Sequence, residues 1–156
     1  MADDTDIAAQ DLPNIGYFKG REHYYPIRVF YEDTDFSGVV YYANYLRFLE
    51  RARSSYFRLA GIGHAELLER DVPLAFVIRK INLDYKRSAK IDDVLSVMTS
   101  YDTFKGARLM VTQKIYRGEE LILTADSEAA CIDLDGRPRR APKEMMEKLR
   151  PFLLEA

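Results

Sequence analysis

The clearest pattern in the chain is a stripe of apolar positions at helical spacing in its first third. Its members recur at intervals of three and four residues: Tyr45, Phe48, Leu49, Ala52, Tyr56 and Leu59. This is the period of a helix with one buried face. The pattern predicts a helix over residues 44–60, with Asn44 capping its amino end or bonding the preceding loop, and Gly61 ending it.

A different pattern follows residue 74. Four stretches rich in Val, Ile, Leu, Thr and Tyr predict strands at 75–84, 94–102, 108–117 and 121–133. Apolar and polar residues alternate within 108–117, as in a sheet with one covered face. The connections are short, and parallel crossovers need about a dozen residues or more, so we expect an antiparallel meander.

The remaining segments complete an α+β arrangement. An earlier strand is predicted at 25–31, and short helices are predicted at 64–70 and 143–150. Residues 1–20 are acidic, contain proline and glycine and show no periodic apolar face, so we expect a flexible tail followed by one domain over 21–156. One long helix and several strands predict an antiparallel sheet packed on that helix.

Composition narrows the possible classes of protein. A chain of 156 residues fits one domain, and a net charge of −2 gives no general attraction to nucleic acid or anionic lipid. Cys131 is the only cysteine, so no intramolecular disulfide or multi-cysteine metal site can form. The first ten residues lack the basic and apolar parts of a signal peptide. We therefore expect a cytoplasmic protein that neither binds nucleic acid nor inserts into a membrane.

The unusual chemistry of the chain lies in the loop between the first strand and the long helix. Asp33 and Asp35 sit there among aromatic residues, and a carboxylate close to Phe36 and Tyr41 could be partly desolvated, which would raise its pKa and its reactivity. The amino end of the helix would favour negative charge nearby and could stabilise an oxyanion. The alternative is that both aspartates only form turns by bonding nearby N–H groups.

The run EDTDFSGVVYYANYLRFLERARSSYF, residues 32–57, carries a family resemblance. It resembles hotdog-fold acyl-CoA thioesterases of the 4-hydroxybenzoyl-CoA thioesterase type, especially the short-chain branch associated with the Tol–Pal system. The likeness continues through residues 84–87 and 92–94. It implies a hotdog fold, in which a sheet of about five strands wraps around the long helix, and hydrolysis of an acyl-CoA thioester without metal or cofactor.

The resemblance assigns roles within the loop. Asp35 matches the catalytic carboxylate, which acts as nucleophile or general base. Asp33 matches a structural position that bonds the loop. Tyr42 stands where many members of the Tol–Pal branch have histidine. A phenol with a pKa of about 10 donates a hydrogen bond but is a poor base at neutral pH, so we expect Tyr42 either to position substrate or only to pack as an aromatic residue at the helix entry. Gly38 allows an unusual backbone conformation or a close approach of ligand.

The resemblance also implies a subunit interface and a site for coenzyme A. Related enzymes form homodimers, often paired into homotetramers, with the active site between subunits, and the backbone near Ala75 would face the carboxylate loop of the neighbouring subunit. Lys105 and Arg108 match the place where related enzymes bind nucleotide phosphates. A second basic cluster, consisting of Lys86, Arg87 and Lys90, is another candidate.

Several alternatives stay open at this point. The same fold could serve as a non-catalytic module that binds acyl-CoA or a protein partner. A hotdog hydratase or dehydratase would need a histidine near the acid, and His23 and His64 both lie far from Asp35 in sequence. The two acids alone are a weak match to a phosphatase or metal motif. The acyl group, short aliphatic or aryl, is not specified by these residues.

Overall fold

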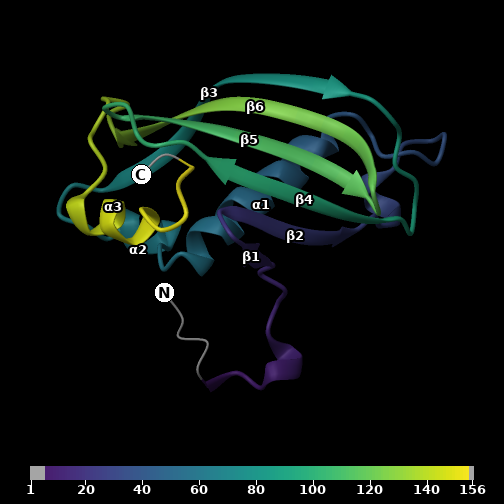
Figure 1. Ribbon diagram of the computed structural model, residues 1–156, viewed down its shortest axis with the longest axis horizontal. Helices are drawn as coiled ribbons and strands as arrows, with labels where there is room; N and C mark the ends of the chain where they lie inside the picture. The colour runs from purple at the N-terminus through teal and green to yellow at the C-terminus, as the bar shows by residue number, and fades with distance from the viewer. Residues whose placement is uncertain (1–5, 155–156) are drawn as a thin grey trace.

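The protein is built from one antiparallel sheet curved around a long helix (Figure 1). The computed structural model describes residues 6–154. Its helices are α1 (Asn44–Leu59), α2 (His64–Leu68) and α3 (Lys143–Leu149), with short 3-10 helices at Ala9–Asp11 and Tyr31–Asp33. Its strands are β1 (Tyr17–Lys19), β2 (Glu22–Arg28), β3 (Leu74–Tyr85), β4 (Val94–Tyr101), β5 (Arg108–Arg117) and β6 (Glu120–Asp133). The predicted α+β sheet on one helix is therefore confirmed.

The order of the strands corrects the predicted meander. The sheet runs β1-β2-β4-β5-β6-β3, with each neighbouring pair antiparallel. Only β4, β5 and β6 follow one another as a meander. The next strand in sequence after β3 is β4, yet β3 pairs with β6 at one edge and β4 pairs with β2. The eight-residue connection from β3 to β4 therefore crosses the curved sheet instead of forming a hairpin.

This crossing segment, residues 86–93, is tied to the start of α1. The Ala89 amide donates to the Tyr45 hydroxyl at 3.1 Å, and the Ala89 carbonyl accepts from the Val40 amide at 2.9 Å. Ala89 and Tyr45 are both buried. Because sequence patterns report local structure only, this long-range anchoring could not be predicted from the short length of the connection.

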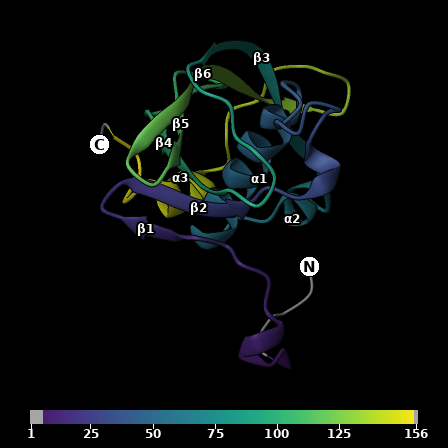
Figure 2. The same ribbon diagram turned by 90° about the vertical axis from the view of Figure 1, so that its right-hand side faces the viewer.

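Helix α1 lies in the concave face of the sheet, as Figure 2 shows from the end. Its buried residues are Tyr45, Phe48, Leu49, Ala52, Tyr56 and Phe57. Five of the six predicted positions are confirmed, whereas Leu59 is exposed and Phe57 takes its place in the core. Gly61 has a φ of +94°, and the Ile62 amide donates to the Phe57 carbonyl, so the helix ends at a left-handed glycine as predicted.

The amino end of α1 and the amino-terminal segment differ from expectation. Asn44 is the first residue of the helix and makes no capping bond to it; its side chain bonds the preceding loop instead. The predicted tail over residues 1–20 also extends too far, because Tyr17–Lys19 is a strand paired with β2. Three residues are too few to show a period of two in the sequence. Residues 1–5 of that predicted tail lie outside the described residues.

The sheet has two ends that matter for function. The loop end carries residues 29–43, the last residues of β3 and the first of β4, and lies beyond the arrowhead of β3 in Figure 1. The hairpin end carries the first residues of β3, the turn between β4 and β5, and helices α2 and α3. None of the helices in residues 6–154 is long and apolar enough to cross a membrane.

Candidate active site

The loop at residues 29–43 is held in shape by Asp33. Its carboxylate accepts from the Phe30 amide at 2.8 Å, and its carbonyl accepts from the Tyr41 amide and from the Asn44 side chain, both at 2.9 Å. These bonds join the two ends of the loop to each other and to α1. Asp33 therefore has the predicted structural role, and Asn44 bonds the loop.

Asp35 opens a tight turn that projects from the same loop. The Gly38 amide donates to its carbonyl at 3.1 Å, and the Asp35 amide donates to the Val39 carbonyl at 2.9 Å. Gly38 has a φ of +83°, and no atom lies within 4 Å of where its Cβ would be. Glycine is therefore needed here for the left-handed backbone of the turn, which is one of the two predicted reasons.

The carboxylate of Asp35 is held in its ionised form. Oδ1 accepts from the Ser37 hydroxyl at 2.5 Å and from the Ser37 amide at 2.8 Å. These two bonds lower the pKa of Asp35 below its ordinary value. The predicted rise in pKa by desolvation is thus wrong for the single chain, because the neighbouring Phe36 is fully exposed and does not cover the carboxylate.

Asp35 nevertheless lies at a cavity. A volume of 320 Å³ is lined by Asp35, Val39, Val40, Tyr42, Tyr45, Tyr85, Lys86, Arg87 and Ser88. The lining thus combines apolar and aromatic side chains with two basic residues, Lys86 and Arg87. Lys86 is paired with Asp84 at 3.0 Å, and Arg87 lies 4.0 Å from Glu120. Two of the three members of the second basic cluster, Lys86 and Arg87, therefore line the cavity of Asp35 within a single chain, whereas Lys90 does not.

Tyr42 is an exposed residue in the lining of this cavity. Its side chain is exposed, its ring packs 5.0 Å from that of Tyr41, and its carbonyl accepts from the Tyr85 hydroxyl at 3.0 Å. The phenol is therefore positioned by its neighbours and can reach a ligand. Its predicted role in positioning substrate is compatible with this geometry.

The amino end of α1 supplies less hydrogen-bonding capacity than expected. The Asn44 amide donates to the Tyr41 carbonyl at 2.8 Å, and the Leu46 amide donates to the Ala43 carbonyl at 3.2 Å. These two donors are already engaged by the loop, so they are not free for an oxyanion. An oxyanion close to Asp35 would need a donor other than these two amides.

The other predicted binding residues lie at the hairpin end. Lys105 and Arg108 close a tight turn through reciprocal backbone bonds of 2.9 and 3.1 Å, and Arg108 lies 3.6 Å from Glu128. Ala75 is in the first part of β3, opposite Ile132 of β6. The eight residues of β4 alone span about 26 Å at ~3.3 Å per residue, so these residues and Asp35 cannot meet within one chain.

Sequence reasoning missed Ser37 and Tyr85. Ser37 supplies both hydrogen bonds to the Asp35 carboxylate, and Asp-x-Ser spacing in a turn is a recognisable signal for such bonds. Tyr85 lines the cavity from the end of β3, and no local signal in the sequence links it to a loop some 45 residues earlier. Among residues 6–154, no group of three His, Cys, Asp or Glu side chains is placed to hold a metal ion.

Comparisons with known proteins agree with this fold. Residues 29–149 match the model of the thioesterase-like superfamily. The acyl-CoA thioesterase YbgC of Haemophilus influenzae is 43% identical over 122 residues, which cover 78% of this chain and 89% of that protein. The acyl-CoA thioester hydrolase YbgC of Escherichia coli O157:H7 is 38% identical over 128 residues, which cover 81% and 94%.

Solved structures show the same likeness. A probable thioesterase from Bartonella henselae superposes with a TM-score of 0.75 at 41% identity, covering 78% of this chain and 99% of that one. The 1,4-dihydroxy-2-naphthoyl-CoA thioesterase of Synechocystis reaches the same TM-score at 20% identity, covering 83% and 96% of the two chains, which is evidence for the fold alone.

The sheet around one helix, with a carboxylate loop at its end, defines a hotdog-fold thioester hydrolase. The chain belongs to the thioesterase-like superfamily. The predicted family, fold and class of enzyme are thereby confirmed. The narrower assignment to the Tol–Pal-associated branch stays a prediction.

Proposed function

We propose that the chain hydrolyses an acyl-CoA thioester to the free acid and coenzyme A, with the carboxylate of Asp35 as the reacting group. The observation that carries this proposal is the position of Asp35: an ionised carboxylate at a 320 Å³ cavity beside the first turn of α1. The names of the YbgC relatives, which are 38–43% identical, support coenzyme A as the carrier of the acyl group.

Two routes fit a carboxylate that is ionised at neutral pH. In the first, an oxygen of Asp35 attacks the thioester carbonyl, the thiolate leaves, and water hydrolyses the resulting mixed anhydride. In the second, Asp35 takes a proton from water, whose oxygen attacks the carbonyl directly. Neither route requires a metal or an organic cofactor, so activity is expected to survive treatment with a chelator.

The walls of the cavity suit a small acyl group. Val39 and Val40 are apolar, and Tyr42, Tyr45 and Tyr85 are aromatic. Such walls accept a short aliphatic chain or a single ring, and the exposed phenol of Tyr42 can donate a hydrogen bond to the substrate.

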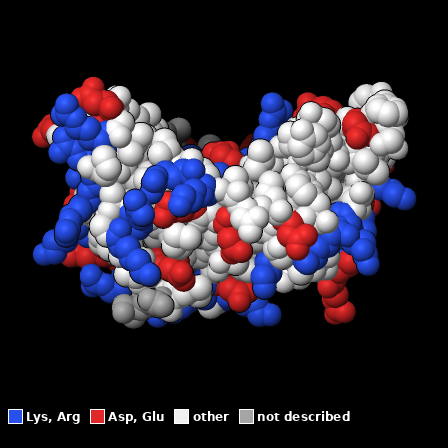
Figure 3. All heavy atoms as spheres, turned by 90° about the horizontal axis from the view of Figure 1, so that it is seen from above, with Lys and Arg blue, Asp and Glu red and all other residues white. Residues whose placement is uncertain are grey.

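The proposal includes a second copy of the chain, because β3 is a long edge strand that pairs with β6 on one side only. Of its twelve residues, eight are exposed, and Val77, Ile78 and Ile81 expose apolar side chains. Such an edge favours pairing with another strand. Figure 3, viewed from above β3, shows uncharged surface over much of the loop end, where Phe36, Tyr42 and Tyr85 are exposed.

Pairing of β3 with β3 of a second copy would complete the site. When two copies of an antiparallel strand pair along their full length, the first residue of one meets the last residue of the other. Leu74 would then lie opposite Tyr85, and the hairpin end of one subunit would meet the loop end of the other. Ala75, Lys105 and Arg108 of one copy would approach Asp35 of its neighbour in a homodimer, with or without further pairing into a homotetramer.

The replacement Asp35→Asn tests the proposed function. It removes the negative charge but keeps the shape, so we expect kcat to fall by more than about 100-fold, as for loss of a nucleophile or general base. Release of free thiol from a series of acyl-CoA thioesters is the measurement. Asp84→Asn is the matched control, because Asp84 is exposed at the same end and does not line the cavity.

The folding and the oligomer size of both variants are measured as controls. Circular dichroism and sedimentation of both variants should match the unmodified protein, because both side chains are on the surface. Normal turnover by Asp35→Asn would reject Asp35 as the reacting group, and an unmodified protein that releases no thiol from any substrate in the series would reject the activity.

A further inference from the structure

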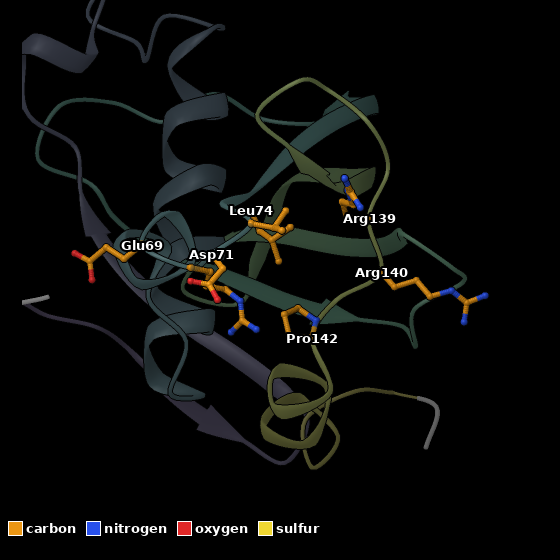
Figure 4. A pocket seen from close by; sticks show the side chains of 8 residues that line it. Glu69, Asp71, Leu74, Arg139, Arg140 and Pro142 are labelled. Carbon is orange, nitrogen blue, oxygen red and sulfur yellow. The ribbon is translucent and has the colours of Figure 1, made fainter.

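Basic residues line a cavity at each end of the sheet, and the cavity at the loop end also contains the proposed reacting group. The cavity at the hairpin end has a volume of 640 Å³ and is lined in part by Arg139 and Arg140 (Figure 4). It lies at the end of the sheet remote from Asp35 of the same chain. The cavity of Asp35 contains Lys86 and Arg87 instead, so these two cations share a cavity with the reacting carboxylate.

The backbone of Lys86 and Arg87 is fixed at the point where the chain leaves β3. The amides of both residues donate to the Ile122 carbonyl of β6, at 2.9 and 3.1 Å. The guanidinium of Arg87 also donates to the Lys86 carbonyl at 3.0 Å. The next part of the crossing segment is held to α1 through Ala89. Both cations are therefore carried by backbone that is anchored to the sheet and to the helix.

The acidic partners of these two cations lie on the surface, outside the lining of the cavity. Lys86 pairs with Asp84 at 3.0 Å, and the two side chains are 41% and 64% exposed. Arg87 lies 4.0 Å from Glu120, which already pairs with Arg117 at 2.5 Å. Ion pairs as exposed as these contribute little free energy. Each cation can therefore exchange its surface partner for an anion in the cavity.

The charges of the cavity do not balance without a ligand. Of its nine lining residues, three are charged at neutral pH: Asp35, Lys86 and Arg87. One negative and two positive groups leave an excess of one positive charge. Of the remaining lining residues, all but Ser88 are valine or tyrosine. A ligand that has a carbon chain and one negative charge therefore complements this lining.

The size of the cavity indicates which part of a thioester substrate carries that charge. A sphere of 320 Å³ is about 8.5 Å across, within the range of ligand sites. In coenzyme A, about 13 bonds separate the thioester sulfur from the nearest phosphorus, and an extended chain of that length spans about 15 Å. An anionic group that contacts Lys86 or Arg87 while the thioester lies at Asp35 therefore belongs to the acyl part of the substrate.

Building on the proposed function, we propose that the acyl group of the preferred substrate ends in a carboxylate, which Lys86 and Arg87 bind while the thioester carbon lies at Asp35. The substrate is then a short dicarboxylic acid joined to coenzyme A through one of its two carboxyl groups. A chain of about four to six carbons spans about 4 to 6 Å between its two carboxyl carbons, which fits the cavity. Arginine binds a carboxylate through its planar fork, and lysine binds it as a point charge.

The chemical step is the same hydrolysis as in the proposed function. Water supplies a hydroxyl group to the acyl carbon and a proton to the thiolate, and the carbon–sulfur bond breaks. The products are coenzyme A and a dicarboxylate, whose second carboxylate takes no part in the reaction. Lys86 and Arg87 therefore determine substrate specificity and are not catalytic residues.

Two thioesters of equal shape and different charge test this assignment. Glutaryl-CoA ends in a carboxylate, and 5-methylhexanoyl-CoA has two methyl groups in place of the two carboxylate oxygens. A charge-assisted hydrogen bond contributes enough to change affinity about tenfold. We expect the unmodified enzyme to show a kcat/KM at least about tenfold higher for glutaryl-CoA, mainly through a lower KM.

The double variant Lys86→Gln with Arg87→Gln should remove this preference. Its kcat/KM for glutaryl-CoA should fall about 100-fold, whereas its turnover of 5-methylhexanoyl-CoA should stay unchanged and thereby show that the fold is intact. Lys90→Gln is the matched control, because Lys90 lies on the same crossing segment and does not line the cavity. If the double variant fails to fold, Arg87→Gln alone replaces it, with an expected loss of about tenfold.

The same two acyl groups on pantetheine, which has no phosphate, separate a carboxylate site from a phosphate site. The loss for the glutaryl thioester should persist on pantetheine. An equal loss for both thioesters would overturn the inference, and its disappearance on pantetheine would assign the two cations to phosphate binding. The inference also fails if the unmodified enzyme does not prefer glutaryl-CoA, or if the double variant hydrolyses it normally. Hydrolysis by Asp35 stands in all these cases, and it fails only if no thioester releases thiol or Asp35→Asn is fully active.

Discussion

The chemistry of the loop depends on single hydrogen bonds around Asp35. Ser37 donates twice to one oxygen of the carboxylate and leaves the other without a partner among the described residues. The carboxylate is thus ionised and oriented, and one oxygen is available for reaction. A turn-forming role and the proposed reactive role, which were alternatives in the sequence, are therefore compatible in Asp35.

The replacement Ser37→Ala tests this arrangement through the pH dependence of activity. Removal of the hydroxyl bond raises the pKa of Asp35 toward its ordinary value, because the ionised form loses a donor. The acid limb of kcat/KM should move to higher pH, while activity at pH 7 stays nearly constant, since the carboxylate is ionised there in both proteins. Ser88→Ala, which changes another residue of the same cavity, should leave the limb in place.

A profile from pH 3 to 8 gives the answer. A limb that stays in place in Ser37→Ala, or one that moves to lower pH, would contradict the role given to the Ser37 hydroxyl.

At the residue scale, the sequence predicted the roles of Asp33 and Gly61 because they depend on bonds to near neighbours. The prediction for the pKa of Asp35 was wrong because it depended on the orientation of a loop side chain, which near neighbours do not determine. The sequence shows that Phe36 follows Asp35, but not that the Phe36 side chain is fully exposed to solvent. The direction of a side chain in a loop depends on contacts with distant segments, which a single sequence does not contain.

At the scale of elements, α1 was predicted well because its buried stripe repeats over four turns. The position of β3 in the sheet was not predicted. It depends on the segment that crosses the sheet after β3, which the hydrogen bond of Ala89 holds to α1. Strand β1 was not predicted because it is short, although it packs over the buried side chain of His23. Phe18 of β1 packs against His23 at 5.1 Å, and the His23 ring bonds the Ile15 carbonyl at 3.0 Å.

His23 makes the stability of this part of the fold dependent on pH. Its side chain is fully buried, and burial lowers its pKa below the ordinary value of 6.5. The unfolded chain therefore binds a proton at a higher pH than the folded chain does, so the free energy of unfolding is at its full value above pH 6.5 and falls as the pH falls through the folded pKa. The carboxylates whose pKa is lowered titrate below this window.

Urea unfolding between pH 7.5 and 5 measures this effect. The unmodified protein should lose stability over this range, and His23→Gln, which has no titrating ring, should show a smaller loss. The pKa of His64 is also lowered by burial, so His64→Gln is run beside it to separate the two contributions. A slope that is equal in the unmodified protein and His23→Gln would exclude His23 as the source.

At the scale of the whole molecule, the candidate site is divided between the two ends of one sheet. Asp35, Gly38 and Tyr42 lie at the loop end, whereas Ala75 and Arg108 lie at the hairpin end. The sequence named both groups but could not show that they are separated in one chain. Their separation is explained if the functional unit contains two chains joined along β3.

The replacement Ile78→Asp tests this unit directly. In full-length pairing of β3 with itself, Ile78 lies opposite Ile81 of the second copy. A carboxylate at position 78 would then be dehydrated against an apolar side chain, which costs free energy and opposes pairing. Ile78 is 37% exposed in the single chain, and the monomer should therefore tolerate the change. Sedimentation at micromolar concentration should show a shift from dimer or tetramer to monomer, together with loss of thioesterase activity, because each site loses the residues supplied by its neighbour.

Tyr17→Asp is the matched control, since Tyr17 is an exposed apolar residue on the opposite edge strand and its replacement should change neither property. A fully active monomer of Ile78→Asp would show that one chain suffices for catalysis, and an unchanged oligomer would place the interface elsewhere.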